Sequence, residues 1–154
     1  MDDLTKFVND FQKFDVNKIL FEVWKKQKVK EFIIELNTKG QSTSQLYEKG
    51  INSKGVSLGD YADSTINGTS SFEGKISKGQ RYDHITLSDS YDFYDSFYVN
   101  AFTDSFSIEA DGRKENVNLL NEYKDIVGLT DENKNILIEF IKPFFIEEAK
   151  KFLQ

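Results

Sequence analysis

A chain of 154 residues has room for one domain with a substantial core, because a chain of about 150 residues buries roughly two thirds of its unfolded surface. The net charge of −6 excludes a phosphate-binding face over the whole chain, and the absence of cysteine excludes disulfides, thiolate metal sites and cysteine nucleophiles. No stretch approaches the roughly 20 apolar residues of a membrane span, and the acidic N-terminus is unlike a signal peptide, so we expect cytoplasmic synthesis and no membrane partner.

The N-terminal third predicts helices. A first short amphipathic helix is indicated by apolar residues at helical spacing, namely Leu4, Phe7, Val8, Phe11 and Phe14. Asp15 is a candidate N-cap for a second, long helix that reaches about Asn37 and ends at Thr38-Lys39-Gly40. The lysines between positions 25 and 30 are typical of a solvated helix face rather than of a phosphate site.

Residues 40–80 differ from the rest of the chain. They hold seven of the nine glycines, many serines and threonines, and few large apolar side chains. We predict one domain over residues 1–154 with a long loop-rich insertion at about 40–80. A loop of this length in a compact domain is usually functional, or disordered when isolated.

The next part of the sequence predicts strands. Residues 84–87 are typical of a short strand, and residues 97–102 and 105–110 each alternate apolar and polar side chains around Thr103-Asp104. This is the pattern of an antiparallel hairpin with one buried face, and Asp111-Gly112 marks its end.

The C-terminal part predicts a short helix around Leu119 and Leu120 and then a longer one. Thr130 is the expected N-cap of the longer helix, and Pro143 is expected to kink it. Together, these elements predict an α+β fold with a long N-terminal helix, a small antiparallel sheet that contains a hairpin, and a kinked C-terminal helix packed on the sheet.

The sequence predicts no catalytic, metal-binding or cofactor-binding residue. His84 has Asp83 and Thr86 nearby, but in a strand Asp83 would point away from the imidazole. Asp89, Asp92 and Asp95 recur every third residue without the glycine and glutamate of a calcium loop. A pair of catalytic carboxylates remains an alternative, because their separation is a three-dimensional property.

Residues 81–111 combine seven acidic and eight aromatic residues with a single base, Arg81. One interpretation is a sheet with an aromatic core; the other is a contact surface, because tyrosines are enriched at protein interfaces. We expect Phe97, Phe106 and Ile108 to point inward and Tyr91, Tyr94 and Tyr98 outward. The candidate subunit-interface residues are Tyr47, Tyr61, Tyr91, Phe93, Tyr94 and Tyr98.

The segment from Thr86 to Phe97, TLSDSYDFYDSF, resembles the T-L-x-D-T-G-x-F/L-x-x-S-F/I element of small head–tail joining proteins of tailed bacteriophages, which include neck and tail-completion proteins. Residues 45–52 and 128–133 are similar to a variant found in phages of Bacteroidetes, including the crAss-like group. The resemblance spans about residues 30–150. Ser90-Tyr91 stand where the element usually has Thr-Gly.

The resemblance implies a virion structural protein at the head–tail junction, without enzymatic activity, that forms a ring of six or twelve copies. Its implied partners are itself, the portal or connector, and tail proteins, while DNA passes nearby without specific binding. The two alternatives are a non-viral protein-binding adaptor and a hydrolase that depends on carboxylates.

Overall fold

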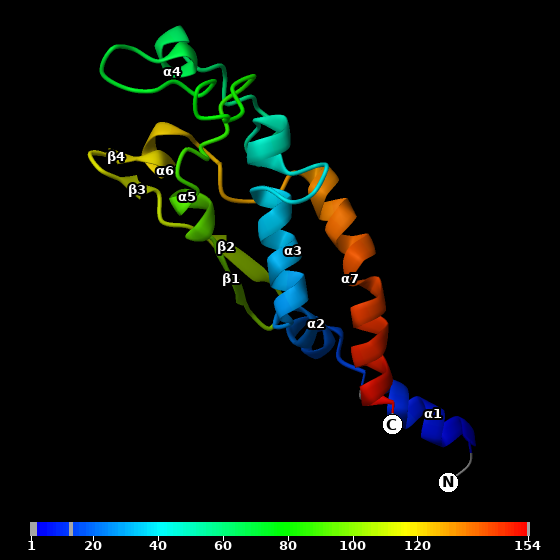
Figure 1. Ribbon diagram of the computed structural model, residues 1–154. Helices are drawn as coiled ribbons and strands as arrows, with labels where there is room; N and C mark the ends of the chain where they lie inside the picture. The colour runs from blue at the N-terminus through cyan, green and yellow to red at the C-terminus, as the bar shows by residue number, and fades with distance from the viewer. Residues whose placement is uncertain (1–2, 13, 154) are drawn as a thin grey trace.

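The computed structural model describes residues 3–12 and 14–153. Its helices are α1 (Asp3–Gln12), α2 (Val16–Trp24), α3 (Gln27–Asn37), the π-helix η1 (Gln45–Lys49), α4 (Asp63–Asn67), α5 (Asp92–Asp95), α6 (Leu119–Glu122) and α7 (Asp131–Phe152). Its strands are β1 (Tyr98–Ala101), β2 (Phe106–Glu109), β3 (Arg113–Lys114) and β4 (Val117–Asn118), in two antiparallel pairs (Figure 1). Helices combined with small antiparallel sheets make the fold α+β.

The predicted long N-terminal helix is wrong. Asp15 does cap a helix, through its carboxylate and the backbone N–H groups of residues 17 and 18, but that helix ends at Trp24. A second helix starts after Lys26, whose ψ of 131° is extended. Six residues at about 100° each would place Val29 roughly 120° from Val23 around one continuous helix. The break lets both side chains enter the same core, where each is fully buried.

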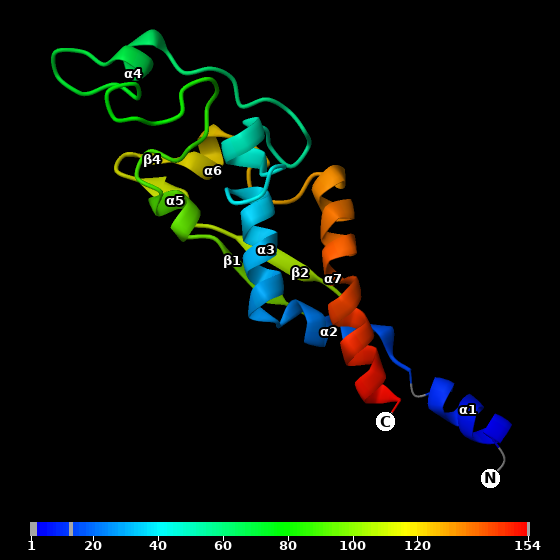
Figure 2. The same cartoon turned by 45° about the vertical axis from the view of Figure 1, so that its right-hand side comes forward.

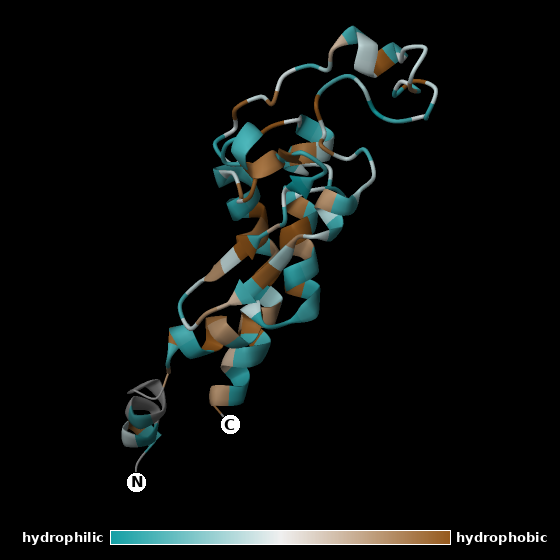
Figure 3. Ribbon diagram, turned by 90° about the vertical axis from the view of Figure 1, so that its left-hand side faces the viewer, coloured by the Kyte–Doolittle hydropathy of each residue, from teal (hydrophilic) through white to brown (hydrophobic). Residues whose placement is uncertain are grey.

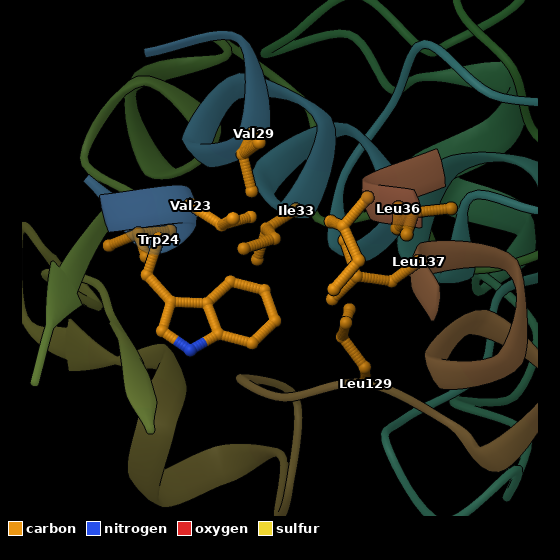
Figure 4. Close-up of a cluster of buried hydrophobic side chains, with 9 residues drawn as sticks. Val23, Trp24, Val29, Ile33, Leu36, Leu129 and Leu137 are labelled. Carbon is orange, nitrogen blue, oxygen red and sulfur yellow. The ribbon is translucent and has the colours of Figure 1, made fainter. Parts of the chain in front are cut away.

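The core lies between α2, α3, α7 and the β1–β2 hairpin. Figure 4 shows Val23, Val29 and Ile33 pointing toward one another beside the ring of Trp24, with Leu36, Leu129 and Leu137 closing the other end. Val99 of β1 joins this cluster from the hairpin. A second cluster combines Phe93 and Tyr94 of α5 with Leu46 of η1 and with Phe97 and Ile126.

The hairpin has the predicted position. Tyr98 pairs with Glu109 and Ala101 with Phe106, so the turn falls at residues 102–105. Val99 is 5% exposed whereas Tyr98 is 49% exposed, as the alternation predicts. The second pair, β3–β4, was not predicted because each strand has only two residues.

Helix α7 begins as predicted, with the Thr130 hydroxyl accepting a hydrogen bond from the N–H of Asn133. It packs against α2 and α3, and these two helices make the main helix contacts with β1. The expectation that α7 lies on the sheet is therefore wrong. The helix continues through Pro143, which lies on its exposed side, and bends gently near its middle (Figure 1).

A buried amide network ties the start of α7 to the ends of α3 and η1. Asn37 donates to the carbonyl of Ile126 at 2.9 Å and accepts from the N–H of Gly128 at 2.8 Å. Asn133 donates to the Leu36 carbonyl, the Thr43 carbonyl and the side chain of Gln45 at 3.0 to 3.1 Å. These partners satisfy backbone groups that a helix end would otherwise leave buried and unbonded.

The strand predicted at residues 84–87 is also wrong. Leu87 has a φ of 59°, which a strand cannot contain. The N–H groups of the two preceding residues donate to loop residues instead of to a neighbouring strand. The Ile85 N–H donates to the Gly59 carbonyl at 3.0 Å, and the Thr86 N–H donates to the Tyr61 hydroxyl at 3.0 Å.

The molecule is elongated, with a projecting segment at each end (Figures 1 and 2). Residues 40–59 belong to the body, because η1 packs against α3 and Leu46 is fully buried. Residues 60–80, the arm, reach out from the opposite end to α1 and carry mixed hydrophilic and hydrophobic positions (Figure 3). Only this second half of the predicted insertion projects from the body.

Candidate interaction site

The arm is held in shape by its own backbone. The N–H groups of Lys75 and Ile76 donate to the carbonyls of Thr65 and Ile66 at 3.0 and 3.1 Å, which folds the segment back on α4. Gly68 and Gly74 make this possible, since a Cβ on Gly74 would lie 2.2 Å from the Gly68 nitrogen. The glycines that signalled a loop in the sequence therefore permit close backbone contact here.

Three polar contacts connect the arm to the segment before α5. The Tyr61 hydroxyl lies 3.1 Å from the Thr86 hydroxyl, Lys78 Nζ lies 3.4 Å from Asp89, and the Gln80 amide donates to the Asp89 carbonyl at 2.8 Å. The arm thus has a defined position over α5.

A groove of about 820 Å³ lies between the arm, α5 and the β3–β4 hairpin. Its apolar lining comes from Phe72, Leu87, Phe93 and Leu119, and Tyr61 and Tyr91 add amphipathic rings. Phe72 is 51% exposed at this hollow surface. The groove combines the apolar area and polar edge that a protein-binding site needs.

Lys75 is the unusual charged residue of this groove. It is only 5% exposed, and its Nζ contacts the Gln80 side-chain oxygen at 3.3 Å and the Tyr61 ring, whose centroid is 4.4 Å away. Within the part of the chain that the structure describes, no carboxylate makes an ion pair with this ammonium. Buried charges in proteins are normally paired, and Lys75 interacts electrostatically with the carboxylate of Asp89.

Two further lysines stand close by on the groove wall. Lys78 and Lys114 lie 3.4 and 3.5 Å from the two oxygens of Asp89. Burial opposes the ionisation of Asp89, but Lys114, Lys78 and Lys75 outweigh it and lower the pKa of that carboxyl. The Asp89 carboxylate thus interacts with three lysines, in a groove whose lining carries five acidic and four basic residues in all.

The six candidate interface residues do not form one surface. Tyr61, Tyr91 and Phe93 line the groove, although Phe93 is 7% exposed and its ring packs edge-on against Phe97 at 5.0 Å. Tyr94 is also 7% exposed and its hydroxyl donates to the Thr86 carbonyl, so the outward orientation expected for Tyr94 is wrong. Burial raises the pKa of Tyr94 and keeps it a neutral donor.

The other two candidates lie outside the groove. Tyr47 is joined to Tyr91 by Lys39, whose Nζ lies 4.1 Å from the Tyr47 ring centroid and 3.3 Å from the Tyr91 hydroxyl. Tyr98 faces solvent on the hairpin, where its hydroxyl donates to Glu109 across the strand pair. The accessible aromatic rings in and beside the groove are therefore those of Tyr61 and Tyr91, with Tyr47 at the margin.

His84 has a structural role. Because residues 84–87 form no strand, Asp83 does reach the imidazole, with its Oδ2 3.5 Å from Nδ1, contrary to the sequence expectation. The Nε2 atom lies 2.7 Å from the Tyr47 carbonyl, and Thr86 contacts Tyr61 and Ser88 instead. A nucleophile, base and acid are thus not aligned here.

Two carboxylates of the groove, Asp89 and Asp111, lack the raised pKa of a general acid. Hydrogen bonds from Arg113 lower the pKa of Asp111 to about 2, and the pKa of Asp89 is also lowered. A glycosidase acid needs a raised pKa. Over the described ranges, no cluster of three acids or histidines is arranged to hold a metal ion.

Neither a protein family, nor a curated protein, nor a solved structure matches this chain. Within residues 3–12 and 14–153, no helix is long and apolar enough to cross a membrane.

Sequence reasoning missed Lys75 and the groove. Lys75 lies between glycines in a polar stretch, where a lysine is normally solvated, and its burial depends on the Gly68–Gly74 contact. The one available signal was Phe72, the only aromatic residue between Tyr61 and Tyr82.

Proposed function

We propose that this chain is a structural subunit of a tailed-phage virion at the head–tail junction: a neck, connector-ring or tail-completion subunit. It assembles with copies of itself in a ring of six or twelve around the DNA channel and contacts portal and tail proteins. It acts through packing, without a cofactor.

The observation that carries this proposal is the backbone at Tyr91. The element that residues 86–97 resemble usually has glycine at this position, and Tyr91 adopts a φ of 61° and a ψ of −2°. This left-handed conformation costs an ordinary residue roughly 1–2 kcal/mol, and glycine tolerates it. The turn thus keeps the glycine geometry although the residue is a tyrosine, which supports the resemblance.

The shape of the molecule supports assembly. The arm and α1 project at opposite ends, and each exposes an apolar side chain, Phe72 at 51% and Leu4 at 72% (Figure 1). Heterologous contacts, in which one end of a subunit meets the other end of the next, generate rings when the rotation closes.

Light scattering of the purified chain, alone and mixed with portal or tail rings, tests the proposal. We expect the mass of six or twelve copies, or binding to one of those rings. A stable monomer that binds neither would contradict it and would favour the adaptor alternative, for which the groove would supply the binding site.

A further inference from the structure

The outer side of α7 carries apolar residues although the inner side of this helix already packs in the core. Leu137 and Ile141 are buried between α7 and the helices α2 and α3, whereas Ile138, Ile146 and Leu153 are 51 to 56% exposed. Figures 1 and 2 show α7 along one flank of the body. A helix with apolar residues on both sides is typical of one that is covered on both sides.

We propose that two copies of this chain pair in solution through the outer face of α7, with the two helices antiparallel and centred between residues 144 and 145. This inference goes beyond the proposed ring. The ring contacts are assigned to the two ends of the subunit, whereas α7 lies on its flank (Figure 1).

Helical geometry defines the residues of this face. If each residue turns by about 100°, five exposed residues lie within about 40° of one direction around the axis, namely Glu139, Lys142, Ile146, Lys150 and Leu153. Pro143 and Glu147, also exposed, lie beside them along one edge. The outer face thus alternates acidic, basic and apolar side chains along the helix.

The first argument is charge complementarity. A two-fold pair of parallel helices would bring each residue against its own copy, and acid would face acid. In the antiparallel pair, residues equally far from the centre on its two sides lie opposite each other. Glu139 then faces Lys150 of the second copy, and Lys142 faces Glu147 of the second copy. The two-fold axis repeats both, which gives four ion pairs between the copies.

These ion pairs extend one that the subunit already has. Lys142 Nζ lies 2.7 Å from a carboxylate oxygen of Glu139 within the same helix. Acids and bases would therefore alternate across the contact as a network. A network is the arrangement in which exposed ion pairs contribute to binding, since a single exposed pair is worth only about 0–1 kcal/mol.

The second argument is shape. A hollow of about 490 Å³ lies on this face, lined by Pro143, Ile146, Glu147, Lys150 and Lys151. The first four have the spacing i, i+3, i+4 and i+7, which is the set of side chains that receives one side chain of a facing helix in knobs-into-holes packing. In the proposed register, Pro143 of the second copy lies opposite Ile146, at this hollow. The apolar contact is then flanked by the four ion pairs.

Two double variants of exposed residues test the charges. Glu139→Lys/Glu147→Lys protein and Lys142→Glu/Lys150→Glu protein each bring like charges together. We expect each alone to self-associate roughly tenfold more weakly than the natural protein in sedimentation equilibrium. An equimolar mixture restores every opposite-charge pair and should form a heterodimer.

The first of these variants separates a specific contact from a general charge effect. Each of its two changes adds two positive charges, so its net charge is −2 where the natural chain has −6. Weaker overall repulsion between copies would strengthen its association. The proposed pairing requires the opposite result.

Disulfide trapping tests the register, because the natural chain has no cysteine. Pro143→Cys protein with an affinity tag is mixed with untagged Ile146→Cys protein and oxidised, and we expect a cross-linked heterodimer. The matched control replaces Pro143→Cys with Asn135→Cys, which is exposed on the same helix. Asn135 faces Ile146 of the second copy only if the register moves by about two helical turns, so this control should give several-fold less product.

The outcomes also separate this pairing from the proposed ring. Association that is equally strong in both double variants, or cross-linking that does not favour position 143 over 135, overturns the pairing and leaves the ring proposal as it stands. Natural protein that forms no dimer also overturns it, and leaves the outer face of α7 to a different protein. Double variants that lose the pair and still assemble six or twelve copies support a separate contact on the flank.

Discussion

Tyr91 shows how one residue can retain a backbone geometry that its side chain disfavours. Its φ of 61° is balanced by contacts of the ring, which lies 6.0 Å from Tyr94 in an edge-on arrangement and 5.1 Å from Lys39 Nζ. The side chain thus offsets part of the cost of the turn.

We predict that Tyr91→Gly is more stable than Tyr91→Ala by about 1 kcal/mol, because both variants lose the ring and only glycine relieves the left-handed φ. Urea denaturation of the two variants measures the difference. Equal stabilities, or a more stable alanine variant, would show that the turn is not left-handed in solution.

Asn133 is a second single residue that stabilises the fold, through its buried hydrogen bonds. It is 1% exposed, and its amide donates to three acceptors near the start of α7. Asn133→Ala should lower the free energy of unfolding by about 2–3 kcal/mol, because two backbone carbonyls lose a partner inside the protein. Asn135→Ala, on the exposed face of the same helix, is the control and should change it by less than about 0.5 kcal/mol. Similar decreases of the free energy of unfolding in both variants would contradict a stabilising role of the Asn133 hydrogen bonds.

Among the elements, the α2–α3 junction is joined to α7 by an ion pair between Lys26 and Glu148. Glu148 accepts from Lys26 and Lys151 at 2.9 Å each, although its side chain is only 8% exposed. The bonds from Lys26 and Lys151 lower the pKa of Glu148 below its ordinary 4.5. Lys26 lies at the junction between α2 and α3, so its ion pair with Glu148 holds this junction next to α7.

The sign of the pH dependence follows from that lowered pKa. A carboxyl with a lower pKa in the folded state than in the unfolded chain contributes stability above the unfolded value, and the contribution is lost as pH falls through the folded value. Glu148→Gln should therefore be less stable than the natural protein at pH 7, with the difference shrinking below about pH 4.5.

Thermal unfolding between pH 3 and pH 7 measures this difference. Glu147→Gln, at an exposed neighbouring position, is the control. A constant difference between Glu148→Gln and the natural protein across this range would exclude the ion pairs as its source.

The elements also show what the sequence could and could not predict. Local signals located the caps at Asp15 and Thr130, the hairpin and the C-terminal helix, because each depends on neighbouring residues. The break after Trp24 was missed, because the apolar residues of α2 and those of α3 reach the same core only if the helix is interrupted between them. The strand at residues 84–87 failed for a similar reason: its backbone bonds to Gly59 and Tyr61, which are distant in sequence.

The sequence indicated some of the residues that line the groove. Tyr61 and Tyr91 do line the groove, but the sequence did not indicate that Tyr94 turns inward or that Lys75 is buried. Both depend on how the arm lies over α5, and no local pattern encodes that placement.

For the whole molecule, the extended outline is directly measurable. A compact chain of this length has a radius of gyration of about 15 Å. Small-angle X-ray scattering at low concentration, extrapolated to zero concentration, should give a clearly larger value, because the arm and α1 extend from opposite ends (Figure 2). A value at the compact limit would mean that both segments fold back on the body.

The arm and α1 project at opposite ends of the molecule (Figures 1 and 2), so the two ends of a subunit differ. A two-fold contact uses the same surface of both copies, whereas a contact between unlike ends leaves one end of every copy free for the next. In the proposed ring, a subunit with one blocked end would therefore terminate growth, and a small fraction of such copies would prevent closure far beyond its own proportion.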